Sequence, residues 1–304
     1  MATATLDGIE TRYEVLGAGP ALLMFSPGGF DATVEKWSTL GVYARIKPLV
    51  HLAQRFQCIV FDRRECGQSG GRVEPLGWPD YVAQGRALLD HLGIERAHLM
   101  GGCMGCSPVT AFAVAHPERV ERLILISPGS LEKDVRGRKT ARPVPRAADV
   151  LILVTPRALA RFLLASNYGD KSKVTEAGVN EWYEFWLREG NRRAMLDRLR
   201  QYVSGDVERT IAAVKVPVLL MWGEKNPRVP VALAYEFQKL LTGSPQVDLK
   251  ILPGVGHMAV QEAPVETSRI VREYLDTAQT GAGARTSGAV SAGTPPPLPE
   301  TPGS

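Results

Sequence analysis

Short apolar runs alternate with amphipathic segments along most of this chain, and this alternation restricts the folds open to it. The runs have the length and the Leu/Val/Ile-rich character of strands that are buried on both faces. They occupy residues 21–25, 58–62, 97–101, 122–127, 217–222 and 247–252. Apolar residues spaced three and four apart predict helices over 80–92, 108–116, 231–241 and 264–276. The alternation predicts an α/β fold with a doubly wound, mostly parallel sheet.

One long stretch, residues 131–213, interrupts the alternation. It has no strand pattern and consists of arginine-rich amphipathic helical sequence. Because it lies between two predicted strands, we expect a helical lid (cap) over one end of a core formed by residues 1–130 and 214–276. Residues 277–304 are mostly Gly, Ala, Ser, Thr and Pro. Such a composition cannot build a core, so this tail is predicted to be disordered.

Charge and apolar content narrow the expected partners and location. The 36 basic and 32 acidic residues give a net charge of +4 without a basic block. Nucleic acid and membrane surfaces are therefore not expected as partners, whereas a small-molecule substrate is. No apolar run approaches the roughly 20 residues that span a bilayer, and residues 1–14 lack a signal-peptide pattern. We expect a cytoplasmic protein with reduced cysteines.

The segment GGCMG, residues 101–105, follows a predicted strand and precedes a predicted helix. This spacing suits a sharp turn in which the central Cys103 points outward and the glycines avoid clashes. The amides at the start of the following helix favour an anion, and a thiolate at Cys103 would gain from them. Cys103 is therefore a candidate nucleophile.

This segment resembles the nucleophile elbow of the α/β-hydrolase family, G-x-S-x-G, with cysteine in place of serine. The resemblance extends from about residue 8 to 276. GPALLMFSPGGFDATVEKW resembles the family's first strand and oxyanion loop, and VFDRRECGQSGG its D-x-R-G-x-G-x-S turn. VPVLLMWGEKNPRVP resembles the strand and loop of the acid, and LPGVGHMAVQEAP the histidine loop. Around the elbow the chain is also similar to proline iminopeptidases.

The resemblance implies an α/β-hydrolase fold and assigns roles to residues of this chain. Cys103 would be the nucleophile and His257 the general base. The backbone amides of Met104 and of Gly28 or Gly29 would form the oxyanion hole.

Asn226 stands where the family has the aspartate of the triad. A neutral amide cannot stabilise an imidazolium as a carboxylate does. A thiol, however, has a pKa of about 8.5 that falls to roughly 3.5–7.5 beside a histidine or at a helix N-terminus. We expect a thiolate–imidazolium pair of Cys103 and His257 before substrate binds, with Asn226 orienting the imidazole through Nδ1–H, as in papain-like Cys-His-Asn sites. The two departures would then compensate each other.

Two alternatives stay open at this point. The carboxylate could come from Glu224, or from Glu132 or Asp134, which follow a strand that carries the acid in some family members. Alternatively, both departures mark a silent small-molecule-binding protein.

Cys103 and Cys106 also form a C-x-x-C motif, which in another fold would be a redox pair. We expect Cys106 to be a small core residue, and a Cys103–Cys106 disulfide that switches activity off stays open as a hypothesis. Cys58 is expected to be inert. No second cysteine or histidine pair has zinc-ligand spacing.

These patterns predict a hydrolase of a small ester, thioester or lactone that works through a Cys103 acyl-enzyme without metal or organic cofactor. An acyltransferase on the same residues, a hydrolase of short peptides or aminoacyl compounds, and a silent binding protein are the alternatives.

Overall fold

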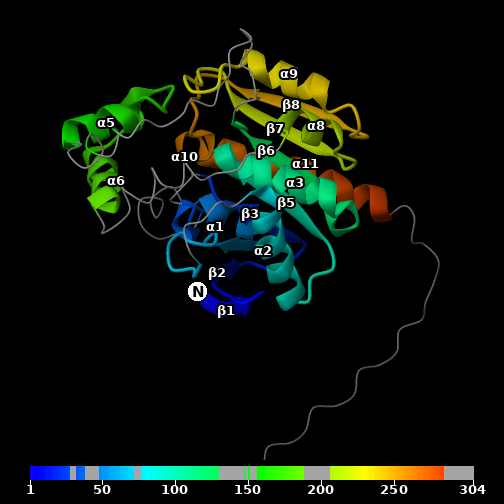
Figure 1. The fold of residues 1–304 in the computed structure, drawn as a ribbon. Coiled ribbons are helices and arrows are strands. Elements are labelled where there is room, and N and C mark those ends of the chain that lie inside the picture. Colours follow the sequence, from blue (N-terminus) through cyan, green and yellow to red (C-terminus); the bar gives the residue numbers. More distant parts are fainter. Residues whose placement is uncertain are drawn as a thin grey trace, which may run out of the picture.

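The computed structural model describes residues 1–27, 32–37, 48–71, 77–129, 147, 150, 156–187 and 206–283. Its centre is an eight-stranded sheet of order β1-β2-β4-β3-β5-β6-β7-β8 (Figure 1). The strands are β1 (Ala2–Leu6), β2 (Ile9–Leu16), β3 (Ala21–Phe25), β4 (Gln57–Phe61), β5 (Ala97–Gly102), β6 (Val120–Ile126), β7 (Val218–Gly223) and β8 (Val247–Leu252). Strands β3 to β8 are parallel, and β2 pairs antiparallel with both β1 and β4. The predicted α/β class with a mostly parallel sheet is confirmed.

The predicted strands are β3 to β8, but the hairpin β1–β2 was not among them. Its turn is Asp7-Gly8, whose φ values of 48° and 78° are both positive. An Asp-Gly pair between two β-prone segments is a hairpin signal. The signal for this hairpin is therefore present in the sequence, although no strand was predicted over residues 1–14.

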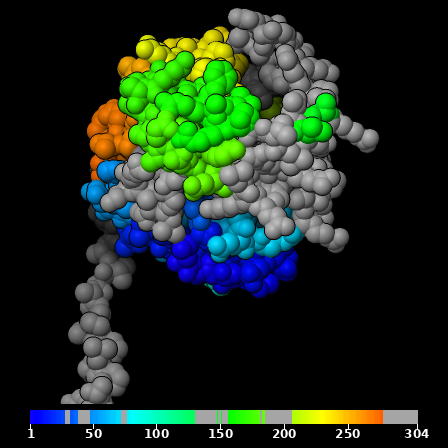
Figure 2. Space-filling view, turned by 90° about the vertical axis from the view of Figure 1, so that its left-hand side faces the viewer, coloured from blue at the N-terminus to red at the C-terminus, as the bar shows by residue number. Residues whose placement is uncertain are grey.

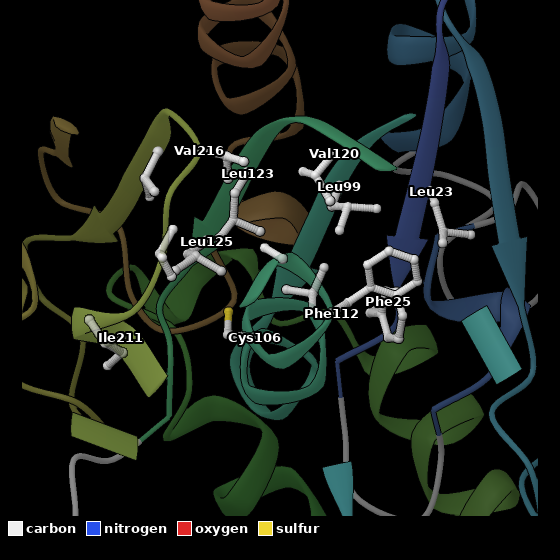
Figure 3. Packing of buried hydrophobic residues seen from close by; sticks show 14 of the residues in the cluster. Leu23, Phe25, Leu99, Cys106, Phe112, Val120, Leu123, Leu125, Ile211 and Val216 are labelled. Atoms are coloured by element: carbon white, nitrogen blue, oxygen red, sulfur yellow. The ribbon is translucent and has the colours of Figure 1, made fainter. Parts of the chain in front are cut away.

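Helices cover both faces of the sheet. On one face lie α2 (Trp78–His91), α3 (Cys106–Ala115), α8 (Val207–Ala212) and α9 (Ala232–Leu240), and on the other α1 (Pro48–Ala53), α10 (Ala259–Glu262) and α11 (Pro264–Gly283). In β3, Leu23 and Phe25 face the first layer, whereas Leu22 and Met24 face the second. Successive strand residues point to opposite faces, so a strand covered on both sides is apolar throughout. Figure 3 shows part of the first cluster around α3.

Besides α8, the described part of the predicted lid contains α5 (Arg157–Ala165) and α6 (Glu176–Leu187). These helices lie on the surface between the N-terminal and the C-terminal parts of the core (Figure 2). Leu164, Val174 and Val179 form their small core, against which Trp182 and Met258 pack. Trp182 therefore packs within the α5–α6 segment, the described part of the predicted lid, and Met258 joins this segment to the core.

Two helices bear on the expected limits of the C-terminal core, residues 214 and 276. Helix α8 precedes residue 214, yet its Ile211 belongs to the large cluster on the sheet. Helix α11 continues through Gly283, beyond the predicted limit at residue 276. The limits at residues 214 and 276 stay predictions, since a sequence pattern does not register which neighbours a helix packs against. No helix in the described part of the chain is both long and apolar enough to cross a bilayer.

Candidate active site

Cys103 lies at the carboxyl end of β5, in the 3₁₀ turn Cys103–Gly105 that leads into α3. Its φ of 49° is a left-handed conformation that non-glycine residues rarely adopt. A Cβ on Gly105 would lie 2.6 Å from the Phe25 carbonyl oxygen and 2.8 Å from that of Ser26. The turn therefore packs directly on the end of β3, which holds Cys103 in its strained conformation.

His257 lies in the loop between β8 and α10. Its Nε2 is 3.0 Å from Cys103 Sγ, although 154 residues separate the two in the sequence. This is hydrogen-bond distance for a thiol and an imidazole, as expected for a nucleophile and its base.

The protonation of His257 differs from the sequence-based expectation. Burial and the nearby Arg228 cation lower the pKa of His257 to about 4. Its buried Nδ1 has no hydrogen-bond partner among the described residues. No carboxylate among the described residues offsets the cost of burying the charged ring, so this environment favours the neutral imidazole, whereas the expected thiolate–imidazolium pair requires the charged one.

Asn226 is 5% exposed and follows β7, but it does not make the predicted hydrogen bond to His257. Its Oδ1 accepts the backbone N–H groups of Arg228 and Val229, each at 3.0 Å. Its Nδ2 has no partner among the described residues. The loop after β7 turns so that the amide oxygen satisfies two backbone donors, as in an Asx turn, and this keeps the oxygen away from the imidazole.

The other expected site residues have different outcomes. Glu224 is exposed, and its carboxylate accepts the Gly254 N–H at 2.9 Å instead of approaching His257. Met104 follows Cys103 in the first turn before α3, where amides lack intrahelical partners. Gly28, Gly29, Glu132 and Asp134 lie outside the described residues.

A cleft of about 190 Å³ opens beside Cys103 and His257. Its wall is largely apolar, with a few polar side chains. The other lining residues are Pro27, Lys36, Trp37, Gly102, Ile126, Asn167, Met258, Ala259, Val260 and Gln261. Asn167 comes from the lid and was not predicted, because nothing in its local sequence marks it. The aromatic side chains described on α6, Trp182 and Tyr183, are not part of this wall.

Asp62 supports one wall of the cleft. Its Oδ1 accepts the Val34 N–H at 2.7 Å, and its Oδ2 accepts the Gln68 N–H at 2.7 Å. Arg12 pairs with Asp62 at 3.2 Å and with Glu35 at 2.7 Å. Asp62 therefore ties residues 32–37 to the turn after β4.

None of the four cysteines, all of which lie in the described part of the chain, forms a disulfide. The sulfur of Cys106 lies in the apolar cluster between α3 and the sheet (Figure 3). Its S–H donates to the Gly101 carbonyl at 3.1 Å, and burial raises its pKa. Burial also raises the pKa of Cys58 to about 12. These environments suit inert core thiols. Within the described ranges, no three or more His, Cys, Asp or Glu side chains are grouped as a metal site would require.

Comparisons with known proteins agree with this architecture. A family model described as alpha/beta hydrolase fold matches residues 22–264. The chain is 30% identical over 287 residues to a 2-hydroxy-6-oxononadienedioate/2-hydroxy-6-oxononatrienedioate hydrolase of Burkholderia vietnamiensis strain G4, covering 88% of this chain and 92% of that protein. It is 28% identical over 281 residues to a 2-hydroxy-6-oxo-6-phenylhexa-2,4-dienoate hydrolase of Comamonas testosteroni, covering 89% and 92%.

Among solved structures, a meta-cleavage product hydrolase variant from Pseudomonas fluorescens IP01 superimposes with a TM-score of 0.72. It is 20% identical, and the match covers 91% of this chain and 98% of that one. At this identity the likeness concerns the fold. The sheet order, the strained turn after β5 and the family model that spans most of the chain lead to one conclusion: this protein belongs to the α/β-hydrolase fold family.

Proposed function

We propose that this protein is a cysteine hydrolase that cleaves a small acyl compound through a thioester on Cys103. The observation that carries the proposal is the 3.0 Å contact between Cys103 Sγ and His257 Nε2 at a left-handed turn facing the cleft. A nucleophile and base at this separation, beside a pocket with an apolar wall, suit attack on a small carbonyl substrate.

We take the first half-reaction to begin from a thiol on Cys103 and the neutral imidazole of His257. As Sγ attacks the carbonyl carbon, the thiol proton moves to His257 Nε2, and the C=O π electrons move to the oxygen. The amides of Met104 and of Gly28 or Gly29 are proposed to hold this oxyanion. When the tetrahedral intermediate collapses, the leaving group takes the proton from Nε2 and departs. The acyl group then remains on Cys103 as a thioester.

The second half-reaction uses the same base. A water molecule attacks the thioester carbon while His257 accepts its proton. The C–S bond breaks, and the imidazolium returns the proton to the sulfur. Amines and thiols can replace water as acceptors of a thioester, so acyl transfer is the variant of this reaction that the same residues would perform.

Mass spectrometry after brief incubation with p-nitrophenyl acetate tests the proposal. An acetyl group should appear on the peptide that contains Cys103 and should be absent in Cys103→Ala. Cys58→Ala, which removes a buried thiol, should retain the adduct. Adding amine or thiol acceptors separates transfer from hydrolysis by product. Binding of the ester without any adduct would identify a silent binding protein instead.

A second candidate reaction is the hydrolysis of a carbon–carbon bond beside a ketone. It is favoured by the Comamonas testosteroni and Burkholderia vietnamiensis relatives, because the substrates that their names give contain neither an ester nor an amide. Hydrolysis of a 2-hydroxy-6-oxo-dienoate would have to break a bond next to the 6-oxo carbon. Assaying such a dienoate beside esters, thioesters, lactones and aminoacyl amides, with wild type and Cys103→Ala, decides between the substrate classes.

A further inference from the structure

Glu262, the last residue of α10, is a buried carboxylate at the joint between lid and core. It is 5% exposed, and Lys173 Nζ donates to its backbone carbonyl at 3.0 Å. Its Oε2 accepts the N–H of Gly256 at 2.8 Å and of Gly169 at 3.1 Å. Its Oε1 accepts the Asp170 N–H at 2.8 Å. A buried carboxylate is costly unless it is hydrogen-bonded, and here backbone donors from two segments meet that need.

One of those segments carries His257, and the other belongs to the lid. Gly256 precedes the histidine, whereas Gly169 and Asp170 follow α5. The lid also binds the histidine backbone directly, because the Asn167 carbonyl accepts the His257 N–H at 2.7 Å. A Cβ on Gly256 would lie 2.6 Å from that carbonyl oxygen. The two segments therefore pack backbone against backbone, with the Glu262 carboxylate bridging them.

The joint matters for the position of His257, because no hydrogen bond is seen on the Nδ1 side of its imidazole in the described part of the chain. His257 Nδ1 has no partner among the described residues, and the Asn226 oxygen is engaged elsewhere. The ring must nevertheless keep Nε2 beside Cys103 Sγ. The hydrogen bonds that restrain this residue act on its backbone. The Glu262 carboxylate accepts the Gly256 N–H, and the Asn167 carbonyl accepts the His257 N–H.

We infer that Glu262 is a positioning residue for His257, and that its three backbone hydrogen bonds couple the lid to the Cys103–His257 pair. The inference rests on the proposed function only in taking that pair as the reactive one. Glutamine has the same length but offers one oxygen acceptor, and its NH₂ group would face an N–H donor. Aspartate keeps both oxygens but is shorter by one methylene. We therefore expect glutamine to release the loop and aspartate to hold it in part.

The rate of Cys103 alkylation by iodoacetamide, followed from about pH 4 to pH 9 in the full chain, tests the inference. Peptide mass spectrometry isolates Cys103 from the other cysteines. His257→Ala defines the profile of a thiol without its imidazole. The Glu262→Gln profile should move to that of His257→Ala, and acylation by p-nitrophenyl acetate should fall at least about tenfold. Glu262→Asp should lie between, and Glu266→Gln, which removes an exposed carboxylate of α11, should match wild type.

A Glu262→Gln protein that melts at a lower temperature but keeps the wild-type alkylation profile would overturn the inference, since its role would then be structural. If Glu262→Gln does not fold, Glu262→Asp decides by the same criterion. Alkylation needs no turnover. A wild type that is never acylated would therefore refute the proposed function, while the alkylation profiles would still decide the role of Glu262.

Discussion

The two loops that bring Cys103 and His257 together are built in different ways. The turn of Cys103 is encoded by its own motif: the glycines between β5 and α3 allow the backbone to turn sharply and to pack on the end of β3. The loop of His257 depends on distant segments, the lid residue Asn167 and the carboxylate of Glu262. The nucleophile is therefore set by a motif, whereas the base is set by tertiary contacts, and the two should respond differently to substitution.

The largest effect is expected from Gly105→Ala, which disturbs the turn that carries Cys103. The added methyl would meet the Phe25 and Ser26 carbonyl oxygens at 2.6 and 2.8 Å. We expect a loss of about 3 kcal/mol in the free energy of unfolding and at least about a 100-fold loss in kcat/KM. Gly102→Ala is the control, because its nearest new contact is Pro27 Cβ at 3.5 Å, and its stability should stay within about 1 kcal/mol. Equal destabilisation of both variants in urea unfolding would show that the turn is not so tightly packed.

The second-largest effect concerns the pKa of His257 and the charge of the neighbouring Arg228. With a His257 pKa of about 4, the base stays unprotonated on acidification until the pH approaches that value, so kcat/KM should persist well below pH 6.5. Arg228→Gln removes a cation that disfavours the imidazolium, and the acid limb should move to higher pH. Arg228→Lys keeps the charge and should leave the limb in place. A wild-type limb near pH 6.5, or identical limbs in all three proteins, would contradict this account of His257.

A smaller effect, dependent on the nucleophile, is expected from Asn226→Asp. The carboxylate can still accept the Arg228 and Val229 N–H groups, and its charge should favour the imidazolium. A serine hydroxyl needs the base more than a thiol does. The gain in kcat/KM should therefore be about tenfold in a Cys103→Ser background and below about threefold in wild type. Similar gains in both backgrounds would refute the idea that cysteine and asparagine compensate each other.

The smallest effect is expected from Glu224→Gln. Among the described residues, this exposed side chain accepts the Gly254 N–H and has no hydrogen bond to His257. Activity should remain within about twofold of wild type, and stability within about 0.5 kcal/mol. A loss of tenfold or more in kcat/KM would instead identify Glu224 as the acid of the site.

Much of the fold could be predicted from the sequence because its signals are local. Continuous apolar runs located β3 to β8 to within two residues at each end, since such runs mark strands that are covered on both faces. Helix α11 ends at Gly283 and not at the predicted residue 276, because the helix pattern fades before the helix itself does.

The site was predictable only in part. The pattern around Cys103 indicated a strained turn, and the structure has φ of 49° there. The expected bond from Asn226 to His257 failed because nearby backbone donors take the amide oxygen. Asn167 and Glu262 were missed, since their importance appears only when the lid lies against the histidine loop.

By itself, the sequence determined the α/β class, the family, and the turn that carries the thiol. Apolar periodicity and the conformational freedom of glycine act within a few residues, so a single chain displays them. Only the tertiary structure decided that the imidazole is neutral, that Asn226 binds backbone amides, and that the lid holds the histidine loop. Desolvation and hydrogen-bond partnership depend on which distant segments meet in space, and no local pattern encodes them.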